Sequence, residues 1–592
     1  MKITLTRLAT ALALSAFGTA ASAALPNGVA AGDVSQTSAV LWGRSDTVGN
    51  LTFQYAADSG FSSILGSSTQ TVADPLAPAK WGVSGLTAGA RYYYRVTDSA
   101  GASAVGTFKT PAALGATTGL RFGVSGDWRG ELLPYPAVQN ADARNLDFFV
   151  NMGDSIYGDV ASPANNFQQQ AQTLAEYRNK HAEVYSAKGG LNGLADLRQS
   201  TALFATIDDH EVTNDFAGGA DVSTDAHFNA DPAGTRINDS TLYNNGLQAF
   251  QDYNPTRADT YGATGDARTA GETKLYRNQN FGSDAALMVL DARSFRDQEL
   301  PAANPASPAS VGAYLASAFD PSRTMLGRAQ VDELKADLLA AQQNSVTWKF
   351  VMVPEPIQNL GVLGASDRFE GYAAERSEIL KFIDDNGIVN VVFVTADIHG
   401  TLVNNLTYQD SAFGAQKATG AFEISTGSVA YDAPFGPTVA QLAVSTGLLT
   451  PEQKAFYDSL PTAAAKDSFI KSVTNGALTP LGYDPLGLDN NLPAANGKIQ
   501  AQLLQGDYLA THVYGWTEFE IDPLTQQLLV TTFGIAPYTA ADVAGDLAGI
   551  AGRTPQIVSQ FLVTPQPVPV PGAVWLFGSA LAGLLGLRRR KV

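Results

Sequence analysis

Residues 120–127 read LRFGVSGD, and residues 146–154 read LDFFVNMGD. In both stretches an apolar run leads into a Gly-Asp pair, which is typical of a buried β-strand that ends in a turn. Segments with a helical pattern separate such strands, and this alternation indicates an α/β arrangement. Because the carboxyl ends of strands in an open α/β sheet meet at one crevice, we expect Asp127 and Asp154 to lie close together.

The same pattern recurs three more times along the chain. Apolar runs at residues 201–207, 285–290 and 389–394 lead into polar groups. Those groups are Asp208-Asp209-His210-Glu211, Asp291-Ala292-Arg293 and Asp397-Ile398-His399. We therefore expect five strand ends to contribute polar side chains to one site, although they are far apart in the sequence.

The residue types at these strand ends suit phosphoester hydrolysis with two metal ions. Such a site needs a carboxylate that bridges the ions, further hard ligands, and cations that face the phosphate. In chain order the sequence offers Asp127-x-Arg129, Gly153-Asp154-x-x-Tyr157, Asp208-Asp209-His210-Glu211-x-x-Asn214-Asp215 and Asp397-x-His399. One aspartate beside a glycine would more often be a turn residue, so the hypothesis rests on the joint pattern.

Four longer segments carry a resemblance to a known family. They are DDHEVTNDFAGG at 208–219, VLDARSFR at 289–296, TMLGRAQ at 324–330 and TWKFVMV at 347–353. With the GDxxY and DxH motifs, the sequence resembles the calcineurin-like metallophosphoesterases and, within them, the PhoD-type alkaline phosphatases. The resemblance covers about residues 25–430 and resumes near residues 505–545.

This resemblance implies an α/β (α+β) fold, a sandwich of two mixed β-sheets flanked by helices. A small fibronectin type III-like β-sandwich is expected before it at residues 24–112, where short aromatic or β-branched runs such as RYYYRV at 91–96 alternate with turns. The metallophosphatase domain is expected at 118–545, with a variable insertion at 410–505 and a linker at 546–566.

The resemblance also implies the metal ligands. Asp154 would bridge two ions and Asp127 would bind one of them. Asn214 and Asp397 would complete a calcium site. Tyr157 and His399 would face a ferric ion, on which a bound water, as hydroxide, would attack phosphorus. From the sequence alone, Tyr157 is also consistent with an ordinary tyrosine at the rim.

Four further residues receive catalytic roles. Arg129 is the first choice to bind and neutralise the phosphoryl oxygens, and Arg293 is the second. The sequence leaves open the alternative that Arg293 pairs with Asp291. We expect His210 to orient or protonate through a contact with Asp209, or to act as a general acid at the leaving oxygen.

The metals follow from the ligand types. Ca²⁺ prefers oxygen ligands, whereas phenolate and imidazole suit iron. The PhoD pattern includes a cysteine on iron, but this chain has 0 cysteines, so zinc, manganese and magnesium stay open as alternatives. Purple acid phosphatases share GDxxY, but their GNHE segment and additional histidine are missing here.

The two ends predict an exported protein. Lys2 and Arg7, an apolar stretch and Ala21-Ser22-Ala23 form the pattern of a signal peptide at residues 1–23. Residues 567–592 contain VPVPG, an apolar run and RRRK, which resembles a PEP-CTERM sorting tail. We expect an inner-membrane anchor that a sorting protease removes, or else a permanent anchor. Either reading places the folded part in the periplasm, at the cell surface or outside the cell.

The composition limits the partners. A net charge of −18 disfavours stable binding of nucleic acid, so the expected partner is a small phosphoester. The leading hypothesis is an alkaline phosphatase acting on mono- or diesters. The alternatives are a phospholipase D-like or nucleotide phosphodiesterase activity at the same site, or a non-catalytic surface or matrix protein on a phosphatase scaffold.

Overall fold

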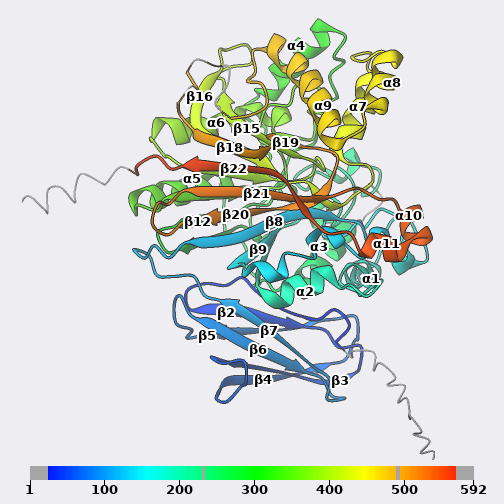
Figure 1. Cartoon of the computed structure of the whole chain (residues 1–592), viewed down its shortest axis with the longest axis vertical. Coiled ribbons are helices and arrows are strands. Elements are labelled where there is room, and N and C mark those ends of the chain that lie inside the picture. The colour runs from blue at the N-terminus through cyan, green and yellow to red at the C-terminus, as the bar shows by residue number, and fades with distance from the viewer. Residues whose placement is uncertain (1–24, 230–233, 489–491, 493, 496, 569–592) are drawn as a thin grey trace, which may run out of the picture.

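The computed structural model describes residues 25–229, 234–488, 492, 494–495 and 497–568. Figure 1 shows a small lobe of strands, blue, below a larger body in which two sheets are stacked among helices. The expected signal peptide at residues 1–23 lies outside the described residues, and so does almost all of the expected sorting tail. Within the described part, no helix is long and apolar enough to cross a membrane.

Two large mixed sheets form the body. The 11-stranded sheet has the order β18-β22-β21-β20-β8-β9-β10-β1-β2-β5, and β17 pairs with β8 beside this path. Its strands are β1 (Val29–Gly32), β2 (Ser38–Gly43), β5 (Ala79–Ser84), β8 (Leu120–Trp128), β9 (Phe148–Asn151), β10 (Ala202–Ala205), β17 (Ser428–Ala430), β18 (Gln500–Gly506), β20 (Tyr514–Ile521), β21 (Leu528–Ile535) and β22 (Gln556–Thr564). The three strands that precede predicted site residues, β8, β9 and β10, run parallel to one another.

The second sheet has seven strands in the order β11-β12-β13-β14-β16-β15-β19. These are β11 (Arg277–Phe281), β12 (Ala285–Val289), β13 (Trp348–Met352), β14 (Val391–Thr395), β15 (Thr401–Tyr408), β16 (Lys417–Ser425) and β19 (Leu509–Ala510). Here β12, β13, β14 and β16 are parallel. The predicted body of two mixed sheets with helices is therefore confirmed.

Helices cover the outer faces of both sheets. The helices are α1 (Leu174–Val184), α2 (Gly193–Ser200), α3 (Thr241–Tyr253), α4 (Pro308–Ala318), α5 (Arg328–Gln343), α6 (Ala373–Asp385), α7 (Phe435–Ser445), α8 (Pro451–Ser459), α9 (Ala463–Leu478), α10 (Ala540–Gly545) and α11 (Leu547–Ala551). Apolar faces of α1, α2 and α3 pack on the 11-stranded sheet, and those of α5 and α6 pack on the seven-stranded sheet. Helix α1 begins with a capping box between Thr173 and Glu176.

The main core lies between the two sheets and includes a cluster of phenylalanines among valine, leucine and alanine side chains. The ring of Phe122 stacks on Phe148 with the centroids 4.6 Å apart, and it meets Phe350 of the other sheet edge-on at 4.9 Å. Aromatic pairs of this kind contribute about 0.5–1.5 kcal/mol each beyond burial of area. This core fixes the two sheets against each other and so fixes the relative positions of their strand ends.

The N-terminal region is less independent than the sequence suggested. A four-stranded sheet of β4 (Ile64–Val72), β3 (Gly49–Ala56), β6 (Arg91–Thr97) and β7 (Ser103–Lys109) forms the outer part of the lobe. However, β1, β2 and β5 continue the 11-stranded sheet, because β1 pairs in parallel with β10. The N-terminal β-domain is present, but one of its two sheets is continuous with that of the body.

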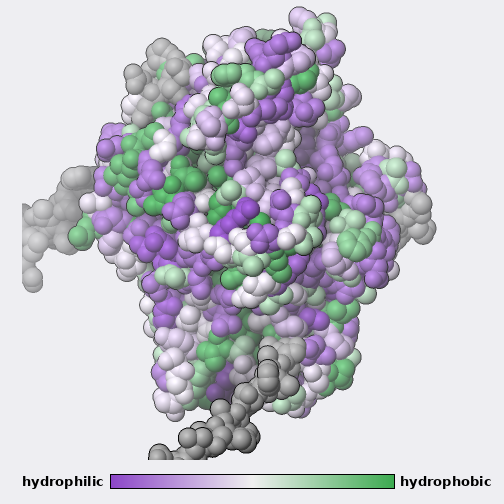
Figure 2. All heavy atoms as spheres, turned by 45° about the vertical axis from the view of Figure 1, so that its right-hand side comes forward, coloured by the Kyte–Doolittle hydropathy of each residue, from purple (hydrophilic) through white to green (hydrophobic). Residues whose placement is uncertain are grey.

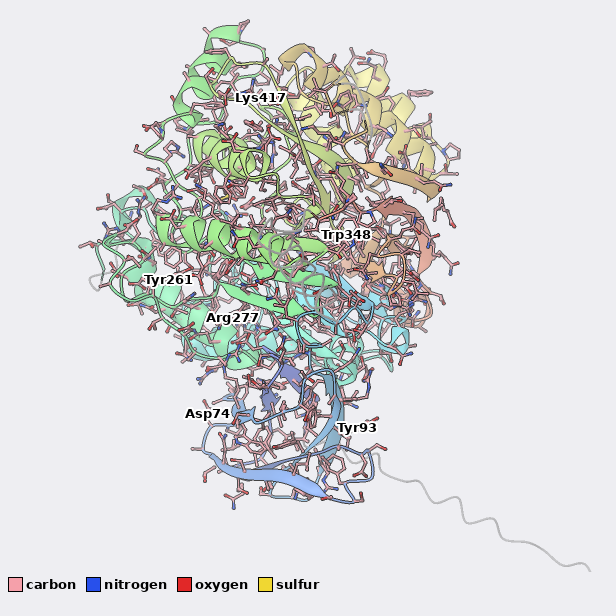
Figure 3. The ribbon with its side chains drawn as sticks, turned by 90° about the vertical axis from the view of Figure 1, so that its left-hand side faces the viewer. Asp74, Tyr93, Tyr261, Arg277, Trp348 and Lys417 are labelled. Atoms are coloured by element: carbon pink, nitrogen blue, oxygen red, sulfur yellow. The ribbon has the colours of Figure 1, made fainter. Side chains whose placement is uncertain are left out.

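Polar contacts and buried aromatic rings also join the lobe to the body. Arg277 of β11 lies just above the lobe in Figure 3 and bonds to Asp33 at 3.0 Å. The Arg198 guanidinium lies over the rings of Trp42 and Tyr185, at 4.4 and 3.9 Å from their centroids. His181 of α1 stacks on Tyr253 with centroids 5.2 Å apart. We call the group of Trp42, His181, Tyr185, Arg198 and Tyr253 the aromatic junction.

Two expected boundaries in the C-terminal half are wrong. The insertion predicted at 410–505 contains β16 and β17, which are strands of the two main sheets, so inserted helices α7, α8 and α9 begin only after Ala430. The linker predicted at 546–566 contains α11 and β22, and β22 pairs with both β21 and β18. Alternating side chains on β22, such as Phe561 and Val563, are buried, which a linker would not require.

The surface is mainly polar. On the face in Figure 2, hydrophilic residues surround separate apolar patches. Among the large apolar side chains that stay exposed are Leu442 and Leu448 of the inserted segment and Leu524 of the turn between β20 and β21.

Candidate metal centre

Parallel strands of both sheets end at one place, and their following residues form the candidate metal centre. Asp127 lies at the end of β8, Asp154 follows β9, and Asp208 and Asp209 follow β10. From the other sheet, Arg293 follows β12, while Asp397 and His399 follow β14. The convergence expected from the sequence is therefore seen in the structure, although it joins two facing sheets and not one.

The backbone at this centre adopts an uncommon conformation. Asp127, Asp154, Asp397 and His399 have φ of 63°, 49°, 61° and 59°, in the left-handed region. Such values cost of order 1–3 kcal/mol for residues other than glycine and persist where the surrounding structure imposes them. A Cβ at Gly153 would lie 2.6 Å from the Asp208 backbone nitrogen, so only glycine lets these two loops approach so closely.

Asp154 belongs to two groups that could each hold a metal ion. Ligand atoms of Asp127, Asp154 and His399 all lie within 4.8 Å of one another, and the same is true of Asp154, Asp209 and His210. Asp208, Asp209 and Asp397 form a third such group beside them. A carboxylate shared between neighbouring groups has the placement that a bridging ligand requires.

Asp127 and Tyr157 are buried beside Asp154. The His399 Nε2 lies 3.3 Å from Asp127 Oδ1, and Asp127 is 1% exposed. The Tyr157 ring is close to His210, with centroids 4.2 Å apart. Burial, followed by the charges of Asp154 and Asp127, raises the pKa of Tyr157 well above its ordinary value. Without a cation the phenol is therefore held in its protonated form.

Glu211 fixes the loops that carry these ligands. Its carboxylate accepts hydrogen bonds from the backbone N–H groups of Asp154, Ser155 and Asp208, at 3.0, 2.6 and 2.8 Å, and from the Ser155 hydroxyl at 2.7 Å. One fully buried side chain thus ties the loop after β9 to the loop after β10. The sequence showed Glu211 within its motif but gave it no role.

His210 has a different partner from the one expected. Its Nδ1 lies 2.6 Å from Asp159 Oδ1, whereas its Nε2 is 4.0 Å from Asp209 Oδ2. The pKa of His210 is raised to about 9, because the charges of Asp209 and Asp159 outweigh the burial that would lower it. The short contact therefore belongs to Asp159, a residue that no sequence motif distinguished.

Arg293 was expected as a second cation that binds phosphate, but its position does not fit that role. Its side chain is completely buried and pairs with Asp208 at 2.5 Å, Glu355 at 2.5 Å and Asp367 at 2.7 Å. Only its backbone N–H bonds to the Asp291 carboxylate, so the alternative Asp291 ion pair is also not formed. Arg293 holds carboxylates of both sheets together and is not exposed to a substrate.

Arg129, the first choice for binding phosphate, lies at the edge of the centre. Its guanidinium is 5.9 Å from the Tyr157 ring and 5.2 Å from the ring of Tyr431, and it pairs with Glu131. Tyr431 in turn stacks on His399 with centroids 3.5 Å apart. The side chain of Arg129 keeps 20% of its area exposed, which leaves it accessible from outside.

Asn214 is the predicted ligand that lies outside the buried groups. It is exposed, and its side-chain amide donates to Asp215 at 2.6 Å. Its backbone N–H donates to Asp159 at 2.9 Å, which keeps it beside His210. In this structure Asn214 is therefore near the centre but bonded to a neighbouring carboxylate.

The electrostatics of the centre indicate a need for cations. Burial, followed by the charges of Asp209, Asp208 and Asp127, raises the pKa of Asp154 well above its ordinary value. Burial, followed by the charges of Asp208 and Asp367, also raises the pKa of Asp397 well above its ordinary value. Neither Asp127 oxygen has a hydrogen-bond partner of acceptable geometry within the described residues. Buried carboxylates that repel one another and lack donors fit bound metal ions, and the available donors are oxygen and nitrogen.

Sequence reasoning missed several residues that surround the centre. Glu355 directly follows the β13 segment and obeys the same strand-end pattern, so it was detectable. Asp367, Asp159 and Tyr431 come from loops whose residue types gave no signal. Together with Arg296, which bonds to Asp367 at 2.6 Å, they complete the ion-pair network around Arg293 and the aromatic contact with His399.

Two facing mixed sheets with carboxylates and imidazoles at their strand ends define a metallophosphoesterase-like protein. A family model described as PhoD-like phosphatase matches residues 124–462, and a second, the PhoD-like phosphatase N-terminal domain, matches residues 11–112. The first match covers more than half of the chain. The chain thus belongs to the PhoD-like phosphatase family, whose members are phosphoric ester hydrolases.

Similar proteins were found both by sequence and by structure. Alkaline phosphatase D of Bacillus subtilis (strain 168) is 27% identical over 415 residues, which cover 64% of this chain and 65% of that protein. The chain thus matches slightly under two thirds of that relative's length. A solved structure of PhoD superimposes with a TM-score of 0.64 at 19% identity, covering 93% of this chain and 94% of the other, which shows the same fold. The purple acid phosphatase PPD1 of yellow lupin (Lupinus luteus) superimposes with a TM-score of 0.45 at 10% identity, over 90% of this chain and 73% of that one.

Proposed function

We propose that this protein is an exported, metal-dependent phosphatase that hydrolyses phosphate mono- or diesters. The observation that carries the proposal is the position of Asp154, which two neighbouring groups of ligand atoms share at the junction of the two sheets. In a member of a phosphatase family, this geometry supports a site for two metal ions. When bound, the ions would neutralise phosphate charge and lower the pKa of a water.

The residues of the chain have separate tasks in this proposal. Asp127, Asp154, Tyr157, Asp209, Asp397 and His399 would hold the ions. Arg129, accessible and oriented by two aromatic rings, would bind the phosphoryl oxygens and keep the phosphorus in place. His210 is left out of the ligand set in this proposal, because its Nδ1 is engaged by Asp159. It would donate a proton toward the leaving oxygen, since the charges of Asp209 and Asp159 raise its pKa to about 9.

For the metals we favour Ca²⁺ beside Asp397 and Fe³⁺ beside Tyr157 and His399. Carboxylates suit the hard calcium ion, while a phenolate and an imidazole suit ferric iron. Burial and the charges of Asp154 and Asp127 raise the pKa of Tyr157, so the phenol would become a ligand only where a bound cation displaces its proton. Zinc, manganese or magnesium are the alternatives, since no thiolate is available in the chain.

The location of the protein and the roles of its ends are part of the same proposal. A cleaved signal peptide at residues 1–23 would export the chain, and the tail at 567–592 would hold it at the inner membrane until a sorting protease acts. The N-terminal domain, which we regard as fibronectin type III-like, would have a positional role. Its support is the shared sheet with the body, which orients the lobe.

The proposal is tested on protein purified from its own cell envelope. Elemental analysis should find two metal ions per chain, and a panel of phosphate monoesters and diesters should reveal hydrolysis and its preference. A calcium-selective chelator should abolish activity, and added Ca²⁺ should restore it. Full activity after verified removal of calcium would refute the calcium assignment, while no hydrolysis of any ester by the metal-loaded protein would refute the function.

A further inference from the structure

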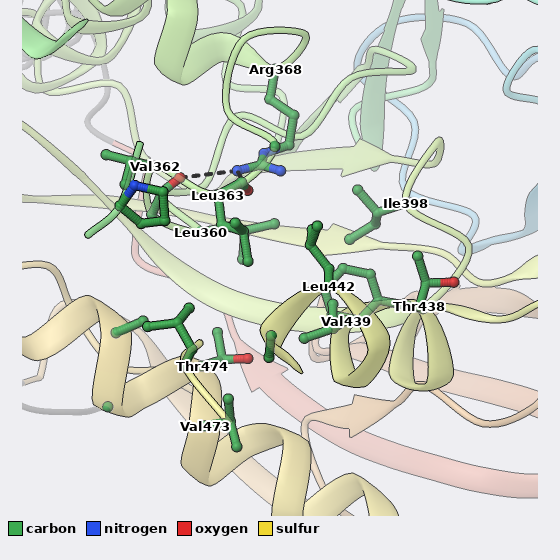
Figure 4. A pocket seen from close by; sticks show the side chains of 18 of the residues that line it. Leu360, Val362, Leu363, Arg368, Ile398, Thr438, Val439, Leu442, Val473 and Thr474 are labelled. Atoms are coloured by element: carbon green, nitrogen blue, oxygen red, sulfur yellow. Dashed lines mark hydrogen bonds between the residues drawn. The ribbon is translucent and has the colours of Figure 1, made fainter. Parts of the chain in front are cut away.

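An apolar pocket lies directly beside the metal centre. It has a volume of about 470 Å³, within the range of about 300–1,000 Å³ that is usual for small-molecule sites. Its walls come from four places. Leu360 and Leu363 lie in the loop after β13, and Ile398 belongs to the DxH segment. The other walls are the inserted helices α7 and α9, with Leu442 and Val473, and the start of α4, with Val311. Figure 4 labels all of these side chains except Val311 and shows them converging on one space.

The pocket and the metal centre share one residue, His399. That residue lines the pocket and also offers a ligand atom to the group containing Asp127 and Asp154. Helix α7 is fixed at this place, because the N–H of Phe435 donates to the His399 carbonyl at 3.1 Å. A Cβ at Gly400 would lie 2.5 Å from the Phe435 Cβ, so the helix packs tightly on the loop that carries His399. A phosphoester held at the metals would therefore reach the pocket by extending past His399.

The chemistry of the walls excludes a charged occupant. Among the described residues that line the pocket, the one arginine is Arg368, no lysine or carboxylate is present, and the charge of Arg368 is already paired. Its guanidinium bonds to Glu370 at 3.0 Å and to the carbonyls of Gly361 and Leu363 at 3.1 and 3.2 Å. The remaining walls are mostly aliphatic, yet Leu442 and Leu448 stay 37% and 46% exposed. Apolar side chains that remain open to solvent beside a reaction centre favour an apolar ligand group.

We propose that this pocket binds the apolar alkyl or aryl group of a phosphoester whose phosphate is held at the metal centre. The inference rests on the proposed phosphatase function and specifies its substrate class. It assigns to the inserted helices α7 and α9 the role of a specificity wall, and it predicts that polar esters such as glycerol phosphate are poor substrates.

A homologous series of substrates tests the pocket. Ethyl, propyl, butyl and hexyl phosphates, with glycerol 1-phosphate as the polar counterpart of the propyl ester, would be compared by kcat/KM. The same series would be run as methyl diesters, so that a preference for diesters does not hide the effect. We expect kcat/KM to rise about threefold to fourfold per methylene, hence about 100-fold from ethyl to hexyl, because each buried methylene adds that much binding.

Variants then locate the effect. Leu442→Asp places a charge in the pocket and should reduce the ratio of hexyl to ethyl kcat/KM from about 100 to below about 10. Val473→Thr, nearly isosteric, should lower the ratio less. Leu524→Asp is the matched control, because Leu524 is 90% exposed and lies outside the pocket, so it should keep the wild-type ratio. A ratio within one variant does not depend on how much of the protein is folded.

The outcomes separate the two proposals. A chain-length preference that Leu442→Asp removes and Leu524→Asp keeps supports the pocket. Equal kcat/KM for ethyl, hexyl and glycerol esters, or a preference that Leu442→Asp leaves intact, overturns the pocket inference and leaves the phosphatase function standing. No hydrolysis of any ester in either series would refute the phosphatase function, and the pocket inference with it.

Discussion

The metal centre and the aromatic junction both bury titratable groups, but they solve the problem of buried charge differently. At the junction, burial, followed by the charge of Arg198, lowers the pKa of His181 to about 3, so the imidazole stays neutral. The cation of Arg198 lies between two aromatic rings and donates to the Tyr253 carbonyl at 2.7 Å. At the centre, carboxylates of like charge are crowded together. Arg293 pairs with some of them, but the pKa values of Asp154 and Asp397 are still raised well above their ordinary values.

The difference shows what each region is for. The junction holds a neutral imidazole and a single cation over aromatic rings, with no crowding of like charges, so it acts as a structural joint even though both ring nitrogens of His181 lack a hydrogen-bond partner within the described residues. Crowded carboxylates with raised pKa values are stable only when cations are added or protons are taken up. The junction should therefore respond to mutation through stability, and the centre through activity and metal content.

The largest effect is expected for Asp154→Asn. Removing the shared carboxylate should lower kcat/KM by about 10³-fold or more, because several kcal/mol of transition-state stabilisation by the ions are lost. The metal-free variant should be at least as stable as the metal-free wild type, since a buried carboxyl whose ionised form is disfavoured is replaced by a neutral amide. Phosphatase assays, metal analysis and thermal unfolding without metal measure these effects. Unchanged turnover would refute the assignment of Asp154.

The next largest effect is expected for Glu211→Gln. Glutamine keeps one acceptor oxygen, but it loses the charge and turns an NH2 donor toward the backbone N–H groups that had donated to the other oxygen. The free energy of unfolding should therefore fall by about 3 kcal/mol, and metal affinity should fall with it. Glu375→Gln is the matched control, because Glu375 also accepts from the backbone N–H groups of Met325 and Leu326 but lies outside the centre. It should lose stability and keep its metal. If both variants keep their metal equally, Glu211 does not position the ligands.

His181 should make the fold sensitive to acid. The unfolded chain takes up a proton at this histidine below pH 6.5, whereas the folded chain does not until about pH 3, so stability falls as pH falls through this window. From pH 7 to pH 5 the loss is about 2 kcal/mol, because 1.36 kcal/mol corresponds to one pKa unit. Urea unfolding at both pH values should show a smaller drop in His181→Leu. The exposed His227 gives the control, and His227→Leu should show the same loss of stability between pH 7 and pH 5 as the wild type.

Arg198→Met should have the smallest effect. A buried cation replaced by an apolar chain of similar size loses its contact with the rings but also its desolvation cost, so stability should change by less than about 1 kcal/mol. Arg198→Ala, which leaves a cavity, should cost about 3 kcal/mol. Chemical unfolding of both variants measures these changes in stability. Activity serves as the control, because a change at the junction should leave it unaltered. A loss from Arg198→Met as large as that from Arg198→Ala would mean that the charge itself stabilises the junction.

The sequence alone determined the ligand types and their order along the chain. Apolar runs followed by aspartate, tyrosine or histidine predicted where strands end, because alternation and burial are local properties of a chain. This rule placed Asp127, Asp154, Asp397 and His399 at one edge, and it would have found Glu355 if applied after residue 353. The two mixed sheets were predicted from the family resemblance and not from this rule.

Only the tertiary structure decided which groups are in contact. The burial of Arg293 among Asp208, Glu355 and Asp367, and the bond from His210 to Asp159, depend on loops from different strands that pack at one point. The sequence cannot show such contacts, because patterns report the local environment of a residue and not its distant neighbours. For the same reason the sheet that continues from β10 into β1, and the apolar pocket between α7 and the loop after β13, could not be predicted.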